Sequence, residues 1–305
     1  LNFVAKRFWF FVISISVITP GIIFLIMAPG LKPGIDFTGG SSMTLQFPEG
    51  TDVSAGEIRE TLDVIGYSES TVQNLGNANY FLRTKELQDE EKESLVTDLT
   101  DIISPKAENV LQSFDLVSPI VAKETVINAL WAILAATVGI FLYVWWAFRN
   151  VPSPFRYGLA AIAALVHDTV IVVGIFAILG ELLDIEVNTM FLIALLTVIG
   201  YSVNDTIVVF DKIRENVLLY GNRAFPEIVN LSISETLGRS INTSFTLLIT
   251  LMALLLFGGA TIREFLIVLV IGVVAGTYSS IAIASQVLVS WDQKSLGIPF
   301  SRKTS

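Results

Sequence analysis

Six stretches of this sequence are long and apolar enough to cross a lipid bilayer, and they constrain the fold more than any other feature. A hydrocarbon core about 30 Å thick needs about 20 mostly apolar residues in a helix. A mean hydropathy of +0.68 and a charged fraction of only 15% agree with this class of protein. The stretches are Phe8–Met27, Val126–Phe148, Tyr157–Leu179, Val187–Phe210, Ile241–Phe257 and Phe265–Trp291. We therefore predict an α-helical polytopic membrane protein with six transmembrane helices.

A single polar block separates the first apolar stretch from the second. Between Ala28 and Glu124 the sequence holds 17 acidic and 7 basic residues, a net charge of −10, whereas the whole chain carries −9. This acidic balance argues against nucleic-acid binding, which favours a basic surface. We expect transmembrane helix 1 at 1–28, a soluble domain at 29–124 and a five-helix transmembrane bundle at 125–305.

Periodicity within the polar block predicts a small α+β domain. Met43, Leu45 and Phe47 alternate with polar residues, as in a half-buried strand. Ser54 and Glu57 have the spacing of a capping box, which opens a helix. Inward-facing residues of the two expected helices are Ile58, Leu62, Ile65, Leu95, Leu99 and Ile102. The remaining elements are expected near Thr71–Leu75, Tyr80–Thr84, Asp89–Ile103 and Asn109–Val117. This β-α-β-β-α-β order is that of the ferredoxin-like fold.

Basic residues in the short loops predict the orientation of the chain in the membrane. If the six spans alternate, ten basic residues fall on one side of the membrane. The short loops on the opposite side hold one basic residue, Arg263. The ten are Lys6, Arg7, Arg149, Arg156, Lys212, Arg214, Arg223, Lys294, Arg302 and Lys303. By the positive-inside rule, both termini are cytoplasmic and the soluble domain is extracytoplasmic. The first span is too long for a cleaved signal peptide. Because the chain opens on Leu1 rather than Met, we expect its natural N-terminus to be missing or altered.

Four titratable or charged residues lie within the predicted spans or at their ends: His167, Asp168, Asp205 and Arg239. A charge at the centre of a spanning helix costs about 2.5–3.5 kcal/mol on insertion scales, so by default it marks a functional site. Asp205 lies shortly before Asp211, in the half of its helix nearer the cytoplasm, and Arg239 lies at the same level. We expect Asp205 and Arg239 to pair, and protonation of Asp205 to release Arg239 in an ion relay.

Each of these residues also has a purely structural interpretation. Arg239 fits a basic flank of a span, Asp205 an interhelical hydrogen bond, and His167 a packing residue. Asp168 fits a hydrogen bond between helices as well as it fits a relay. A polar stripe that fits interhelical packing follows Arg239 on one helix face, and its members are Asn242, Thr243, Thr246 and Thr250.

The connection before the fifth span is polar and is expected to contain a separate amphipathic helix. Its apolar residues are Ile228, Leu231, Ile233 and Leu237, and the fifth span is expected to begin at Arg239. The sixth span is rich in small residues, which allow close packing of helices. They include Gly272, Gly276, Ser279 and Ser280.

The sequence offers no pattern for covalent or nucleotide chemistry. It contains no G-x-x-x-x-G-K-[ST] phosphate loop, no spaced His or Cys cluster and no nucleophile site. We therefore predict that the chain is not an enzyme and has no cofactor or metal. An ion gradient would supply its energy, since 100 mV is worth about 2.3 kcal/mol per charge.

Four motifs, in this order and spacing, resemble the SecF family, the smaller membrane subunits of the SecDF accessory complex of bacterial protein export. They are Gly34 to Gly40 (GIDFTGG) after the first span, His167-Asp168 in the third, Gly200 to Thr206 (GYSVNDT) with Phe210 to Asn216 (FDKIREN) in the fourth, and Glu235 to Ser244 (ETLGRSINTS) in the fifth. The resemblance covers nearly the whole chain. Ser240 stands where threonine is usual, and Lys212 where arginine is common.

The resemblance implies a half-transporter of the resistance-nodulation-division superfamily in the bacterial inner membrane. Six spans would pair with six of SecD beside the SecYEG channel, with YajC as a further candidate partner. A proton gradient, or sodium in some relatives, would drive external domains that pull a preprotein outward. The implied ion-pathway residues are Asp205, Arg239 and Thr243, beside His167 and Asp168, and the family motif includes Gly34, Asp36, Gly39, Gly40 and Asn204. Two alternatives remain open, a split efflux transporter and a scaffold that only stabilises the translocon.

Overall fold

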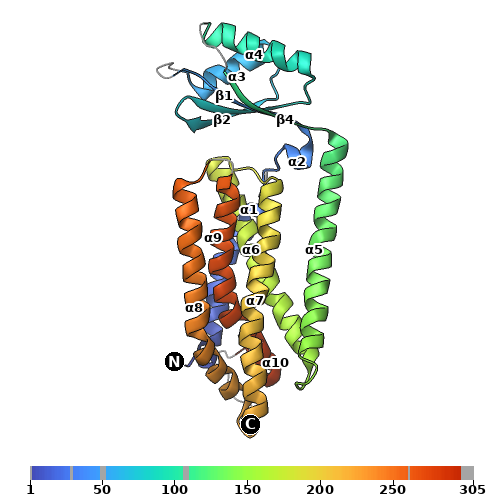
Figure 1. The fold of residues 1–305 in the computed structure, drawn as a ribbon, viewed down its shortest axis with the longest axis vertical. Coiled ribbons are helices and arrows are strands. Elements are labelled where there is room, and N and C mark those ends of the chain that lie inside the picture. The colour runs from blue at the N-terminus through green and yellow to red at the C-terminus, as the bar shows by residue number, and fades with distance from the viewer. Residues whose placement is uncertain (1, 28–29, 49–52, 106–109, 260–261, 297–305) are drawn as a thin grey trace. The chain divides into compact units, whose positions relative to one another are not determined.

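The computed structural model describes residues 2–27, 30–48, 53–105, 110–259 and 262–296 (Figure 1). The chain forms two compact units: unit 1 is Leu1–Lys32 with Trp131–Ser305, and unit 2 is Pro33–Leu130. Some sequence-based expectations lie outside the described residues. They concern the domain boundary at 28–29, Asn109 at the start of the last strand, and the basic residues Arg302 and Lys303.

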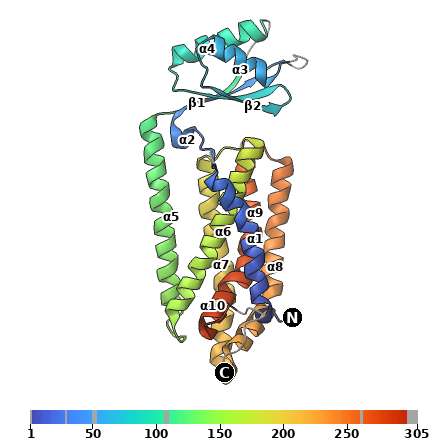
Figure 2. The ribbon, with the colours of Figure 1, turned by 180° about the vertical axis from the view of Figure 1, so that it is seen from behind.

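Unit 2 contains the predicted β-α-β-β-α-β order, preceded by a short helix α2. The elements are α2 (Ile35–Thr38), β1 (Gly40–Gln46), α3 (Ala55–Val64), β2 (Thr71–Gly76), β3 (Asn79–Thr84), α4 (Asp89–Ile103) and β4 (Leu111–Val117). The sheet order is β2-β3-β1-β4, and all neighbouring strands are antiparallel. Helices α3 and α4 cover one face of this sheet (Figures 1 and 2).

The apolar side chains that alternate along the strands form the core of unit 2 with those of the two helices. Met43, Leu45, Ile58, Leu62, Leu95 and Leu99 are all buried in one cluster. The Ser54–Glu57 capping box is present at the start of α3. The expectation for Ile102 is wrong, because this side chain is 55% exposed. The neighbouring Ile103 packs against the core instead, so the last turn of α4 is rotated by one residue relative to the predicted face.

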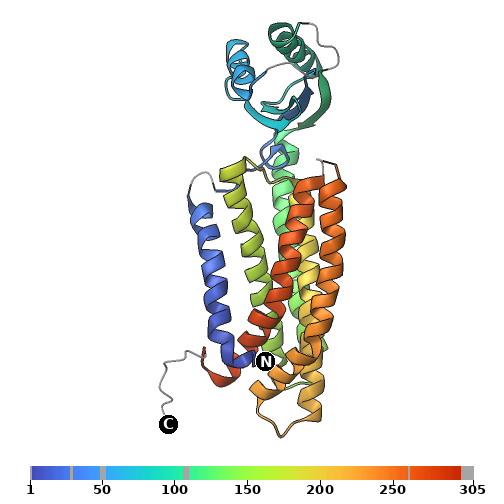
Figure 3. The same cartoon turned by 90° about the vertical axis from the view of Figure 1, so that its left-hand side faces the viewer.

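In the part of the chain that the structure describes, six helical segments are long and apolar enough to cross a membrane, as predicted. The helices are α1 (Arg7–Ile26, after a 3₁₀ turn at Val4–Lys6), α5 (Pro119–Ala147), α6 (Pro154–Leu183), α7 (Thr189–Leu219), α8 (Phe225–Phe257) and α9 (Arg263–Ser279). The last continues through a π-helical turn, Ser280–Ala284, into α10 (Ser285–Gln293). Figure 3 shows α1, in blue, alongside α6 in yellow-green.

The fourth and fifth spans extend beyond their predicted bounds. Helix α7 continues past Phe210 to Leu219, and α8 begins at Phe225 rather than at Arg239. The predicted separate amphipathic helix is therefore wrong, because that segment is the first part of α8. Its apolar residues, such as the fully buried Ile233, join the core of unit 1. The apolar stripe thus marks a packed face of a continuous helix.

Glycines let two pairs of helices approach closely in unit 1. A Cβ on Gly21 of α1 would lie 2.7 Å from the Cα of Gly174 of α6, so the two backbones are in contact. Between α7 and α9, a Cβ on Gly272 would lie 2.1 Å from the Val198 side chain. A Cβ on Gly276 would lie 2.9 Å from the Cβ of Ser202. These contacts hold α1, α6, α7 and α9 close enough for short side chains to meet.

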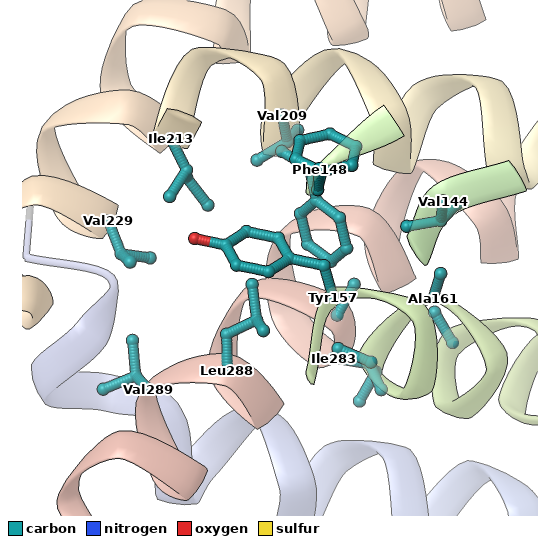
Figure 4. Close-up of a cluster of buried hydrophobic side chains, with 14 of the residues drawn as sticks. Val144, Phe148, Tyr157, Ala161, Val209, Ile213, Val229, Ile283, Leu288 and Val289 are labelled. Atoms are coloured by element: carbon teal, nitrogen blue, oxygen red, sulfur yellow. The ribbon is translucent and has the colours of Figure 1, made fainter. Parts of the chain in front are cut away.

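One end of unit 1 is closed by a cluster of apolar and aromatic side chains (Figure 4). Tyr157 at the start of α6 stacks on Phe148, with ring centroids 5.2 Å apart, and both rings contact Phe210 edge-on. Residues of α8 and α10, including Val229 and Leu288, complete the cluster. This packing fixes the ends of α5, α6, α7, α8 and α10 relative to one another.

Candidate functional site

Helix α6 brings the first buried carboxylate into the interior of unit 1. Asp168 is 2% exposed and its neighbour His167 is 7% exposed. The Nδ1 atom of His167 lies 2.9 Å from Oδ1 of Asp168, and its Nε2 lies 3.0 Å from Oγ of Ser14 on α1. The imidazole therefore connects α1 to the Asp168 carboxylate.

The other oxygen of Asp168 is held by two serines from different helices. Ser202 of α7 donates to Oδ2 at 2.5 Å, and Ser279 of α9 donates to the same atom at 2.6 Å. The close approach of Gly276 to Ser202 makes this convergence possible, because short hydroxyl side chains reach the carboxylate only when the backbones are near. A buried carboxylate with three hydrogen-bond partners satisfies the requirement that buried charges be solvated by the protein.

A chain of hydroxyl groups extends from His167 toward α1. Ser14 donates to the hydroxyl of Tyr278 at 3.2 Å, and Tyr278 donates to the carbonyl oxygen of Phe10 at 2.8 Å. The rings of His167 and Tyr278 stack at 5.9 Å. The side chains of Ser14, His167 and Tyr278 and the carbonyl of Phe10 all lie within helices that are predicted to span the membrane.

The tautomer of His167 decides the direction of these hydrogen bonds. With the hydrogen on Nδ1, the imidazole donates to Oδ1 of Asp168 and its Nε2 accepts from Ser14. With the hydrogen on Nε2, the imidazole donates to Ser14, and Ser14 is free to donate to Tyr278.

Helix α7 carries the second buried carboxylate, Asp205, which is 9% exposed. Ser240 of α8 donates to its Oδ1 at 2.7 Å, and Ser280 donates to its Oδ2 at 2.5 Å. Ser280 opens the π-helical turn between α9 and α10, a local geometry that is frequent at functional sites. Because Ser279 binds Asp168 and Ser280 binds Asp205, two consecutive residues connect the carboxylates to one helix.

The expected ion pair between Asp205 and Arg239 is not formed in this structure. Arg239 is exposed, and its guanidinium has no ion pair among the described residues. Helical spacing explains the difference, because Ser240, one residue further on, occupies the face of α8 that turns toward α7. The buried polar residues of α8 are Ser232, Thr236, Ser240 and Ser244, at intervals of four. The stripe of Thr243, Thr246 and Thr250 is exposed instead.

Two further residues of the predicted site, one on α7 and one on α8, are also exposed. Asn204 is exposed, next to the buried Asp205. The Thr243 hydroxyl donates to the backbone oxygen of Arg239 at 2.9 Å. The structure therefore brings His167 and Asp168 together, places Asp205 with serines, and leaves Arg239, Thr243 and Asn204 on a surface of the chain.

Sequence reasoning missed most of the groups that hold the two carboxylates. These groups are the hydroxyls of Ser14, Ser202, Ser240, Ser279, Ser280 and Tyr278. The available signal was the presence of serines inside apolar spans, because a hydroxyl in hydrocarbon needs a partner. No group of three His, Cys, Asp or Glu residues suited to a metal occurs in the described ranges.

The Gly34-to-Gly40 motif forms a tight entry into the sheet of unit 2. Gly39 and Gly40 have φ values of +75° and +117°, which favour glycine. A Cβ on Gly40 would lie 2.7 Å from the carbonyl oxygen of Thr84. Gly34 and Asp36 belong to the turn of α2, which Arg83 fastens by donating to the Thr38 hydroxyl at 2.7 Å. The motif therefore has a structural role within unit 2.

Comparison with known proteins agrees with these features. Residues 98–294 match the C-terminal region of the protein export membrane proteins SecD/SecF, and residues 24–47 match the SecD/SecF GG motif. The chain belongs to the SecD/SecF family. The family resemblance read from the sequence is thus confirmed. Together with the six apolar helices, membership of SecD/SecF makes this a multi-pass membrane protein.

Individual SecD/SecF relatives are similar over nearly the whole chain. Protein translocase subunit SecF of Thermobaculum terrenum is 43% identical, over 96% of this chain and 95% of the relative. The SecF subunit of Anaerolinea thermophila is 40% identical, over 96% and 94%. The crystal structure of SecDF from Thermus thermophilus, described as a translocon-associated membrane protein, matches with a TM-score of 0.83 and 32% identity. That match covers 96% of this chain but only 39% of the SecDF chain.

Proposed function

We propose that this chain is the SecF-type subunit of a protein export complex and acts with a SecD-type partner. Protein translocase subunit SecDF of Bacillus subtilis is 34% identical over 97% of this chain, which corresponds to 38% of that protein. The remaining length of the fused relatives is where a SecD-type partner would be found. This subunit would assist late steps of export in the bacterial inner membrane, beside SecYEG, with YajC and the translocating preprotein as further partners.

The proposal includes an orientation and a fold class for the soluble unit. The concentration of basic residues at one end of the spans supports cytoplasmic termini and an extracytoplasmic unit 2. The antiparallel β2-β3-β1-β4 sheet, with two helices on one face, supports a ferredoxin-like class for unit 2. No enzymatic step is part of the proposal.

We further propose that the buried carboxylates conduct the coupling ion, a proton or, as in some relatives, sodium. The observation that supports it is the hydrogen-bonding of Asp205 to two helices at once. An ionised Asp205 accepts from Ser240 and from Ser280, so it ties α7 to α8 and to the π-helical turn. A proton on this carboxyl group would convert one oxygen to a donor and weaken the hydrogen bond from Ser240 or the one from Ser280. Ion binding would thereby shift the packing of α8 against α9.

The exposed polar residues would complete this pathway at the surface that meets the partner. Arg239, Thr243 and Asn204 lie in predicted spans and face away from the chain's own helices. A guanidinium in hydrocarbon is expensive unless another group solvates it. Six partner spans packed on this side would cover Arg239 and could supply a group for it. His167 and Asp168 would hold a second proton in the same pathway.

The test compares two aspartates of the same helix, Asp205 and Asp211. Asp211 is 56% exposed at its side chain and pairs with Arg214. Export into inverted membrane vesicles is measured with and without an imposed gradient, beside co-purification with the SecD-type partner. We expect Asp205→Asn to lose at least about tenfold of the gradient-dependent export, as expected for loss of one charged pathway group. Asp211→Asn should retain it.

A scaffold that only stabilises the translocon gives a different result. In that case Asp205→Asn would export with its full gradient response as long as the complex assembles. Such an outcome would remove the ion pathway from the proposal and leave the subunit assignment in place. Repeating the measurement with a sodium gradient in place of a proton gradient identifies the ion.

A further inference from the structure

A cavity of about 250 Å³ lies at the end of unit 1 where α6 and α8 begin and where α7 and α10 end. It is independent of the two buried carboxylates. Its polar lining consists of Ser153, Arg156, Tyr157, Arg223 and Asp292. Pockets for drug-sized ligands are typically about 300–1,000 Å³, so this volume suits a smaller chemical group.

Two arginines of the cavity have no acidic partner. Among the described residues, neither Arg156 nor Arg223 forms an ion pair with Asp292 or with any other carboxylate. Arg156 lies over the ring of Trp291, 5.9 Å from its centroid, and Arg223 lies over the ring of Tyr220 at 4.8 Å. Stacking on a ring fixes a guanidinium and leaves its N–H edge free to donate. With Asp292 as the opposing charge, the lining carries a net charge of +1.

The hydroxyl of Tyr157 also has no protein partner in this cavity. Tyr157 is 2% exposed as a residue, its hydroxyl makes no hydrogen bond to any described residue, and its oxygen is open to the cavity. Figure 4 shows the oxygen pointing away from Phe148, between Ile213 and Val229 of the same cluster. A ligand atom in the cavity would take the place of water at this hydroxyl.

The position of the cavity agrees with an anionic ligand at the membrane surface. The first turns of α6 and α8 and the last turns of α7 and α10 border it, so the helix dipoles offset one another and the two arginines supply the positive charge. Four spans end at this level, and Trp291 is 42% exposed there, as residues of an interfacial aromatic belt are. Basic pockets between transmembrane helices at this depth bind anionic lipid head groups.

We propose that this cavity binds a phosphate group as a monoanion, held by Arg156, Arg223 and the hydroxyl of Tyr157. A net charge of +1 matches a phosphodiester better than a dianion. The group can come from a phospholipid head group at the membrane surface or from free phosphate in the adjoining water, since both present the same oxygens.

The test measures ligand-dependent thermal stability of the purified full-length chain after lipid removal in detergent. The probes are short-chain phosphatidylglycerol, inorganic phosphate and an uncharged diacylglycerol of equal chain length. We expect the phosphate-bearing probes, and not diacylglycerol, to raise the Tm. A response to phosphatidylglycerol alone assigns the site to lipid, and a response to both assigns it to phosphate in general.

Matched variants separate this site from non-specific charge. Arg156→Gln and Arg223→Gln should each weaken binding at least about tenfold, because each removes a charge-assisted hydrogen bond. Tyr157→Phe, which keeps the stacked ring, should weaken it less. Asp292→Asn should strengthen it by removing the repelling charge. The control is Arg149→Gln, an exposed arginine at the same end that contacts Trp146 instead.

Two results would overturn the proposal. One is an equal Tm shift with diacylglycerol and phosphatidylglycerol, which would mean that acyl chains alone act. The other is an equal loss of binding in Arg149→Gln and Arg156→Gln, which would mean that the general basic surface attracts the probe. Circular dichroism of each variant before the titration establishes that it is folded.

Discussion

The two buried carboxylates of unit 1 are held in different ways. Asp168 has three partners on three helices, including an imidazole, and is enclosed by this chain alone. Asp205 has two hydroxyl partners, and its neighbour Asn204 is exposed. The Asp168 site is therefore complete without a second protein, whereas the Asp205 site borders a polar surface that only another chain could cover. The two carboxylates therefore differ in how much of their surroundings this chain supplies, with Asp168 the more completely enclosed.

The largest expected effect tests whether the hydrogen bonds to Asp168 stabilise the chain more than those to Asp205. Asp168→Ala leaves an imidazole and two hydroxyls without their acceptor, and each unsatisfied buried group costs about 1–3 kcal/mol. We expect a loss of at least about 3 kcal/mol for Asp168→Ala and about 2 kcal/mol for Asp205→Ala, by the same principle. Thermal unfolding of the purified chain in detergent measures both. Asp211→Ala, at an exposed position of α7, is the control. Equal losses at the two carboxylates would remove the distinction.

A finer test uses the consecutive serines Ser279 and Ser280. Each donates to one carboxylate, so replacing either with alanine should cost about 1.5 kcal/mol of stability, the value for a hydrogen bond to a charged group. We expect Ser280→Ala to reduce gradient-dependent export more than Ser279→Ala, because Ser280 acts on Asp205. Ser234→Ala is the control, since that exposed hydroxyl bonds only to its own helix. A larger export defect in Ser279→Ala would transfer the coupling role to Asp168.

The smallest effect on stability is expected at Arg239. Its side chain is exposed and has no ion pair among the described residues, so Arg239→Met should change the free energy of unfolding of the isolated chain by no more than about 0.5 kcal/mol. Export by the complete complex should fall, because the guanidinium would meet its partner there. Arg149→Met serves as an exposed arginine away from α8. A marked loss of stability in the isolated Arg239→Met chain would show that the residue supports folding instead.

Most of the fold could be predicted because it depends on local patterns. Apolar length predicted six spans, period-two alternation predicted the strands around Met43, and the Ser54–Glu57 spacing predicted the start of α3. The bounds of α8 could not be predicted in this way. An amphipathic stripe looks the same whether it faces water at a surface or packs on a neighbouring helix, and the burial of Ile233 depends on residues far away in the sequence.

The same distinction between local pattern and tertiary packing applies to the candidate site. The sequence by itself determined which carboxylates are buried, since Asp168 and Asp205 stand within apolar spans, where an unsolvated charge is costly. Only the tertiary structure decided what solvates them. Arg239 and Ser240 are adjacent on α8, and a helix turns by about 100° per residue, so one points outward when the other faces Asp205. That choice depends on how α8 packs against α7 and α9, which no local pattern records.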